Sequence, residues 1–292
     1  LSMTHWSPIG DLPTEENMLN SYKSWQKTPQ GKQLKYNFQE FKPIYFWEYL
    51  HRLLTRLMMV LVYIIPFVIF IWKKWITKKD IKKYSVLGIL GALQAWFGFL
   101  MVKSGLEDVP HVSHFWLAIH FITACIILSL IFWYILDLNL PLKGNKKINK
   151  YSKYFLVVLT LQLIYGAFTS GLNAGIHKST NVISSLFGYY NQSFQGFDIF
   201  NNDLNIQFIH RMIAWGILLF SIYIWKKTRN TNLKKEGNIV LSLVLVQVIL
   251  GISTLLLDVQ KHIAITHQFV AALLLLGTIY LIHQSQSSEK SQ

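Results

Sequence analysis

The stretch FWEYLHRLLTRLMMVLVYIIPFVIFIW, residues 46–72, joins a polar beginning to a long apolar run. A helix needs about 20 mostly apolar residues to cross the ~30 Å hydrocarbon core of a bilayer. The segment reaches that length from Tyr45 onward, and backbone groups in lipid must be paired within their own segment. The stretch therefore predicts a transmembrane helix with an acid, a histidine and an arginine at its mouth.

Similar apolar runs recur along the chain, of which 52% is hydrophobic. Each is long enough, or nearly so, to cross a bilayer as a helix. The single cysteine, Cys125, lies inside one of them and is expected to pack against other helices. The sequence predicts an all-α polytopic membrane protein with seven spans. The six further runs are 84–102, 115–136, 154–172, 206–225, 238–257 and 263–282.

The net charge of +14 is unevenly distributed between the loops. Most lysines gather in loops 73–83, 141–153 and 226–235, whereas loops 103–113 and 258–262 hold one lysine each. Short cytoplasmic loops carry an excess of Lys and Arg, so the lysine-rich loops and the C-terminal tail are predicted to face the cytoplasm. The charge indicates topology and contact with membrane lipid, and nucleic acid is not an expected partner.

The chain repeats itself in two halves. EYLHRLLTR at 48–56 is echoed by QFIHRMIAW at 207–215, and LQAWFGFLMVKSGL at 93–106 by LQLIYGAFTSGL at 161–172. Related halves are common in membrane proteins and build a site in each half or between them. We predict two pseudo-repeated four-helix bundles, 1–150 and 151–292. Because the first half shows three spans and the second shows four, a further span is expected before residue 1.

Four histidines, His51, His120, His210 and His267, lie within predicted spans. Each lies four to seven residues past the outer entry of its span, which places it roughly 6–10 Å deep at 1.5 Å per residue. A single histidine in a span often only bonds two helices together, but polar residues in spans usually mark functional sites. The other six histidines fall in loops or at span ends, where they are expected to be solvated.

Imidazole is a common ligand of haem iron, and two histidines on facing helices can sandwich a planar macrocycle. Zinc would instead require four ligands in tetrahedral array. The pattern therefore predicts one haem in each half, held by His51 with His120 and by His210 with His267.

Glu48 lies three residues before His51, on nearly the same helix face. The second half has Gln207 at the matching position, which suggests that one haem is a cofactor and the other is acted on. The alternative is an interfacial carboxylate paired with Arg52 or Lys42.

Arginines accompany the predicted ligands. Arg52 and Arg211 directly follow His51 and His210, so they point away from the ligand face. They either reach haem propionates or anchor the helix at the outer interface. Arg56, one turn deeper, is a third candidate for contact with a propionate.

Several motifs together resemble the haem A synthase family, in its mitochondrial-type and related bacterial branch. The resemblance covers essentially the whole chain. It implies eight spans in two four-helix halves, with haem sites near the outer face of a bacterial cytoplasmic membrane, so the chain is expected to be a fragment that begins after the first span. The motifs are LSMTHWSPIG, FKPIYFWEYLHR, MVKSGL with VSHFWLAIH, YGAFTSGLNAG, QFIHR and THQF.

The resemblance assigns His210 and His267 to the iron of a haem b cofactor and His51 and His120 to substrate haem O, with Glu48 as the catalytic carboxylate beside it. The implied reaction converts the C8 methyl group of haem O to a formyl group by two hydroxylations with water as the oxygen source, giving haem A for cytochrome oxidase. Haem O synthase, an electron acceptor and a second copy of the chain are candidate partners.

Two other functions use the same histidines. A bis-histidine di-haem cytochrome would pass electrons with both haems permanently bound and without need of Glu48. A non-catalytic haem-handling or assembly protein would also tolerate loss of Glu48.

Overall fold

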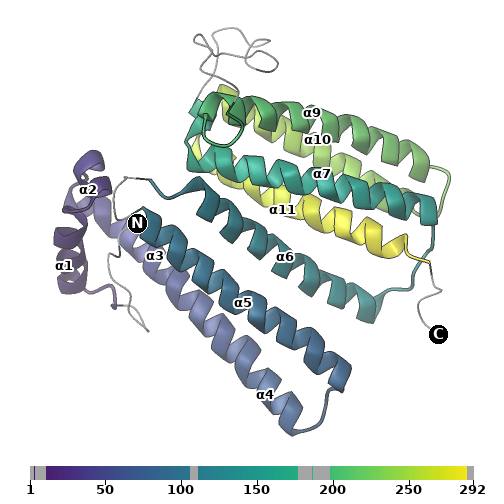
Figure 1. Cartoon of the computed structure of the whole chain (residues 1–292), viewed down its shortest axis with the longest axis horizontal. Helices are drawn as coiled ribbons and strands as arrows, with labels where there is room; N and C mark the ends of the chain where they lie inside the picture. Colours follow the sequence, from purple (N-terminus) through teal and green to yellow (C-terminus); the bar gives the residue numbers. More distant parts are fainter. Residues whose placement is uncertain (1–2, 4–10, 106–110, 177–185, 187–197, 288–292) are drawn as a thin grey trace. The chain divides into compact units, whose positions relative to one another are not determined.

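The predicted spans form long helices in the computed structural model, which describes residues 3, 11–105, 111–176, 186 and 198–287 (Figure 1). No strand occurs in those ranges, so the all-α membrane architecture is confirmed. The seven helical segments long and apolar enough to cross a membrane are Phe38–Trp72, Lys78–Ser104, His114–Leu138, Lys146–Gly171, Asp203–Thr228, Lys234–Leu256 and Lys261–Gln284.

Polar residues begin these helices. Thr77 accepts from the backbone N–H of Asp80, whose carboxylate accepts from Thr77, so this capping box starts α5 (Lys78–Ser104). Asn37 and Glu40 form the same arrangement at the start of α3 (Phe38–Leu57). Each cap satisfies N–H groups that have no partner within the helix. The spans that begin with α3 and α5 therefore start from polar, well-paired ends, whereas α10 and α11 have no side-chain cap.

The chain divides into two compact units, Leu1–Thr123 and Ala124–Gln292, with the boundary inside α6 (His114–Asn139). The predicted halves, 1–150 and 151–292, rest on the sequence repeat and stay a prediction.

The first unit begins with two short helices, α1 (Glu15–Trp25) and α2 (Pro29–Leu34), before the first span. The Trp25 ring lies 5.3 Å from that of Phe41 on α3. Tyr45 is fully buried, and its hydroxyl donates to the carbonyl of Asp11. This aromatic cluster, which also contains Met3 and Tyr49, fixes the beginning of α3, where the predicted site residues start.

The first span changes its winding halfway. After α3, the π-helix η1 (Met58–Ile64) leads into α4 (Ile65–Trp72). Within η1 the Tyr63 hydroxyl donates to the carbonyl of Tyr84 on α5 at 2.6 Å. The Tyr63 ring also occupies the space in which a side chain at Gly88 would lie. These contacts hold α5 against the first span.

The second unit contains a four-helix bundle formed by α7 (Lys146–Gly171), α9 (Asp203–Thr228), α10 (Lys234–Leu256) and α11 (Lys261–Gln284) (Figure 1). A short 3-10 turn, η2 (Ala174–Ile176), follows α7. Helices α7 and α10 each contact both α9 and α11. Consequently α9 and α11 occupy opposite corners of the bundle.

One end of this bundle is closed by buried polar groups. The Lys143 ammonium lies 2.6 Å from the carboxylate of Glu236, which is fully buried at the start of α10. The backbone N–H groups of Lys143 and Gly144 donate to the carbonyl of Gln284 at the end of α11. The loop before α7 is thereby bonded to both α10 and α11.

His283 departs from its expected solvated position. Its side chain is only 1% exposed, and Nε2 lies 3.1 Å from a carboxylate oxygen of Asp137. The Trp133 ring meets it edge-on, with ring centroids 5.1 Å apart. The expectation was wrong because the end of α11 is covered by α6, although it lies beyond the apolar run.

Candidate functional site

His210 and His267 project from the diagonally opposed helices α9 and α11 of the second unit. They interact electrostatically with one another, so they share one region of the bundle. Both histidines are half-buried. The structure thus brings this predicted pair together from two corners of a four-helix bundle, as a site between facing helices requires.

The His210 ring rests against α7. A Cβ atom on Gly166 would lie 3.1 Å from its Cε1, so the absent side chain makes room for the imidazole. Four residues earlier, the Gln162 amide nitrogen lies 3.4 Å from His210 Nε2. Gly166 and Gln162 therefore form one contact site for the ring, and we call such a Gln and Gly pair a histidine seat.

The His267 ring rests on α10 in the same way. A Cβ atom on Gly251 would lie 3.1 Å from its Cε1, and the Gln247 amide nitrogen lies 3.3 Å from Nε2. The two histidines of the second unit are thus held by neighbouring helices through identical residue types at identical spacing.

His51 and His120 belong to the first unit, on α3 and on the first half of α6. They too interact electrostatically with one another. The His120 ring meets α5, where a Cβ atom on Gly98 would lie 2.9 Å from Cε1 and the Gln94 amide nitrogen lies 3.3 Å from Nε2. In addition, His120 Nδ1 lies 3.1 Å from the carbonyl oxygen of Gln94.

Glu48 contacts Arg52 one helical turn away. The carboxylate and guanidinium lie 2.6 Å apart, and both side chains are about one-sixth exposed, at 16% and 17%. Lys42, the other expected partner of Glu48, pairs instead with Glu15 at 3.0 Å. A second nitrogen contact of Arg52 reaches the carbonyl of Met3 at 3.4 Å. Arg52 is therefore engaged with its own helix and with the segment before it.

The other two arginines lie close to the histidines along their helices. Arg211 lies over the ring of Phe208, 5.8 Å from its centroid. Arg56 lies within electrostatic range of Arg52. The position corresponding to Glu48 holds Gln207, which is almost fully buried. The two units therefore differ by one carboxylate near otherwise similar histidines.

The donor atoms fit a haem. Within the described ranges no three His, Cys, Asp or Glu side chains come together as a set that could hold a metal ion. A site with two imidazoles on facing helices matches the axial ligation of haem, whereas zinc prefers four protein ligands. Both units supply such imidazoles, so a bis-histidine haem site suits each of them.

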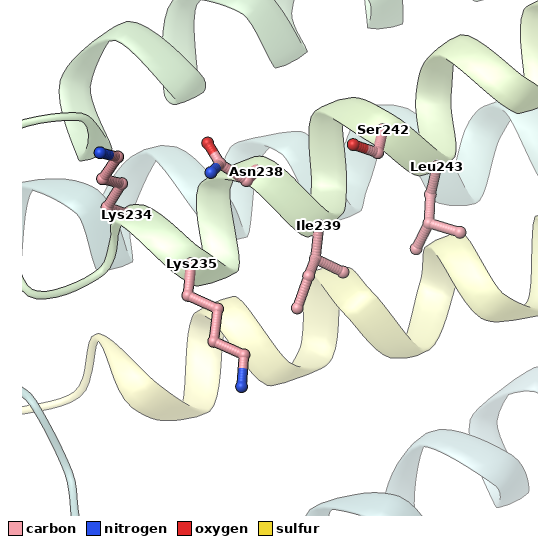
Figure 2. Close-up of a pocket in the computed structure, with 6 residues that line it drawn as sticks. All are labelled: Lys234, Lys235, Asn238, Ile239, Ser242 and Leu243. Carbon is pink, nitrogen blue, oxygen red and sulfur yellow. The ribbon is translucent and has the colours of Figure 1, made fainter.

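A surface groove lies elsewhere, on α10. It follows the outer face of α10 from Lys234 and Lys235 to Leu243, and Figure 2 shows the lysine side chains at one end and the apolar ones pointing toward α11. None of the predicted site residues lines it. The candidate site is therefore the interior between helices that carry the histidines, not this surface groove.

Sequence reasoning missed the three glutamines and glycines. Their signal is a repeated spacing, Gln followed four residues later by Gly, in QAWFG at 94–98, QLIYG at 162–166 and QVILG at 247–251. Each segment lies on the helix that precedes a histidine-bearing helix. Two of these segments lie within the sequence repeat of the two halves. That each contacts a histidine is seen only in the structure.

Comparison with known proteins places the whole pattern in a family. Residues 1–279 match the family model COX15-CtaA, described as cytochrome oxidase assembly protein. A Wolbachia pipientis wMel protein named "Heme A synthase" is 37% identical over 97% of this chain and 83% of its own length. Proteins with the same name from Flavobacterium psychrophilum and Ehrlichia ruminantium are 34% and 35% identical, each over 97% of this chain and over 89% and 84% of their own lengths.

Proposed function

The chain belongs to the COX15-CtaA family of cytochrome oxidase assembly proteins, and from this premise we propose that it is a haem A synthase. Its reaction converts the C8 methyl group of haem O to a formyl group. The proposal is supported by relatives that bear this name and align over nearly the entire chain.

The observation that carries the proposal is the difference between the two histidine pairs. Both units bring two histidines together, but only the first has a carboxylate, Glu48, three residues before the first histidine of its pair. Gln207 takes the matching place in the second unit. One site therefore has an additional ionisable group and suits a haem that reacts, while the other suits a haem that is only held.

In this proposal His210 and His267 hold the iron of haem b, and His51 and His120 bind substrate haem O. When bound, haem b supplies a redox centre through which electrons can leave the substrate site. Arg52, Arg56 and Arg211 are the proposed contacts for propionates, because guanidinium groups bind carboxylates with well-defined geometry.

Glu48 acts at the methyl group. Each hydroxylation adds the oxygen of one water molecule and removes two electrons and two protons, and the resulting diol loses water to leave the aldehyde. A carboxylate nearby stabilises the positive charge that builds at the carbon and accepts a proton from the attacking water. Arg52 fixes the carboxylate in place through the 2.6 Å contact.

The test is Glu48→Gln in the full chain, expressed in cells that make haem O. General acid–base catalysis contributes about 10²–10⁴-fold to a rate, so haem A formation should fall by at least ~10²-fold while haem O or a hydroxylated intermediate accumulates. Chromatography and mass spectrometry of extracted haems measure this. Glu15→Gln, which changes an exposed acid that pairs with Lys42, is the matched control and should form haem A normally.

Haem A formation at the normal rate in Glu48→Gln would remove the carboxylate from the mechanism. The second candidate, a di-haem cytochrome, is favoured by the nearly identical seats of His120, His210 and His267. Under that alternative the extracted haems would be haem b alone, even from cells that supply haem O.

The proposed location is a bacterial cytoplasmic membrane with the haem sites near its outer face. The lysine-rich loops support this orientation, and the relatives named above are bacterial. The oxidation needs an electron acceptor outside the chain. Haem O synthase and a second copy of the chain are further proposed partners.

A further inference from the structure

Three of the four candidate ligand histidines each contact one glutamine and one glycine of a neighbouring helix. The ligand assignment gives these glutamines and glycines no role. We propose that Gln94, Gln162 and Gln247 are positioning residues that prepare His120, His210 and His267 for haem. The side-chain amide of each glutamine donates to Nε2 of its histidine until iron takes that place, and the backbone carbonyl of Gln94 also accepts from His120 Nδ1. This inference rests on the proposed function, since it concerns the same haem sites.

The contacts of His120 define the tautomer. A carbonyl oxygen can only accept a hydrogen bond, so the 3.1 Å contact with Gln94 requires the proton on Nδ1. Nε2 of the neutral ring is then an acceptor, and the amide N–H₂ of Gln94 donates to it at 3.3 Å. The backbone and the side chain of Gln94 therefore bond to the two different ring nitrogens of His120. Together they select the tautomer protonated at Nδ1, which is the one that binds a metal through Nε2.

In the second unit, Nδ1 of His210 and Nδ1 of His267 have no hydrogen-bond partner among the described residues. The amide contacts to Nε2, however, are as close as in the first unit, at 3.4 and 3.3 Å.

A purely structural role does not explain the glutamines. Their amide oxygens are buried and have no hydrogen-bond partner among the described residues. An unsatisfied buried acceptor is costly, so leucine would pack more favourably if the side chain only filled space. The hydrogen bond of each amide to the imidazole accounts for a glutamine at these positions.

The amide bonds are also long enough to be exchanged. N–H donors usually lie 2.7–3.2 Å from their acceptors, so contacts of 3.3 and 3.4 Å are weak. In the haem-free protein this weak hydrogen bond occupies the lone pair of Nε2. Replacing it by iron costs little free energy because the bond is weak. In the substrate site the same bond can reform as the product haem leaves His120.

The glycines supply the second part of the seat. A Cβ atom on Gly98, Gly166 or Gly251 would stand 2.9–3.1 Å from a ring carbon, closer than side-chain atoms normally approach. Gly216, in α9, has no atom within 4 Å of such a Cβ and provides a matched control. Alanine at Gly251 should displace the His267 ring, while alanine at Gly216 should not.

The experiment uses the full chain in lipid nanodiscs, labelled with ¹⁵N-histidine and expressed under haem limitation. In haem-free protein, ¹⁵N spectra should show His267 protonated at Nδ1, and Gln247→Leu should shift its Nε2 resonance because the donor is gone. Haem b titrated into the same samples should bind Gln247→Leu about two- to tenfold more tightly, the change equivalent to one net hydrogen bond.

Gly251→Ala keeps the test decisive if Gln247→Leu does not fold. It should bind haem b at least about tenfold more weakly and change the electron paramagnetic resonance g-values, because the ring plane turns. Gly216→Ala should match the wild type in both measurements.

An Nε2 resonance and a haem affinity that do not change in Gln247→Leu would overturn the inference. Weaker haem binding in that variant would also overturn it, because the glutamine would then support bound haem instead of yielding to it. A glutamine-dependent Nε2 resonance in a protein that binds no haem would support the positioning role and overturn the proposed function.

Discussion

The four candidate ligand histidines differ in their surroundings more than their sequence context suggests. His120, His210 and His267 each lie against a glutamine and a glycine of the preceding helix. No glycine or glutamine makes that contact with His51 in the ranges that the structure describes. At the level of single residues, His51 is therefore the least preorganised of the four.

Removing single ligands should separate the two proposed haems. In His267→Ala the proposed haem b site loses one of its two histidines, so the purified protein should lose about one of two haems per chain. The pyridine haemochrome assay measures this. His262→Ala, an exposed position on the same helix, is the control and should keep both. Full haem content in His267→Ala would exclude this residue as a ligand.

The histidines could be selected from the sequence because polar residues in spans are rare and these four are predicted to lie at a similar depth. Gln94, Gln162 and Gln247 could not be selected so readily, since a glutamine near a helix interface has many structural uses. The ion pair of Glu48 with Arg52 was one of two alternatives left open, and only the side-chain positions distinguish Arg52 from Lys42.

Helices α9 and α10 meet at an unusually close point. A Cβ atom on Gly237, in the first turn of α10, would collide with the Thr228 side chain at the end of α9. Gly237→Ala should therefore destabilise the protein by about 1–3 kcal/mol, the usual cost of overpacking a core. Unfolding in a graded detergent series measures the change.

Gly216→Ala tests the same substitution without the collision. Because nothing lies near its Cβ, the helix preference for alanine should stabilise the protein by ~0.5–1 kcal/mol. Equal effects at Gly216 and Gly237 would refute the packing explanation.

The spans were predictable as elements because length and apolarity alone identify them. The elements outside lipid were not. Helices α1 and α2 are short, and the aromatic contacts of α1 with α3 join residues far apart in the chain. The π-helix η1 has no sequence signature, because its winding depends on contacts such as that between Tyr63 and Tyr84.

The membrane orientation predicted for this chain rests on the distribution of its lysines. With Cys125→Ser as background, Lys261→Cys should react with a membrane-impermeant maleimide on intact cells, whereas Lys79→Cys should react only after the cells are opened. Both lysines are exposed and lie at opposite predicted sides. The reverse labelling pattern would invert the orientation and place the haem sites near the cytoplasm.

Spans of the two units also differ in the fraction of their residues that other parts of the protein bury. Half of the most apolar window of α11 is buried, but none of that of α5. Sequence hydropathy could not anticipate this difference, since both helices are apolar enough to span. It arises from the neighbours that each helix meets within its own unit.

The recurring seat also matters for protein engineering. The pairs α5 with α6, α7 with α9 and α10 with α11 each carry the complete arrangement, with Gln and Gly on the first helix and His on the second. The arrangement thus needs only two adjacent helices, not an entire bundle. A designer could transfer the Gln-x-x-x-Gly segment and its facing histidine to an artificial transmembrane helical hairpin. Two such hairpins packed together would then supply two histidines for a haem.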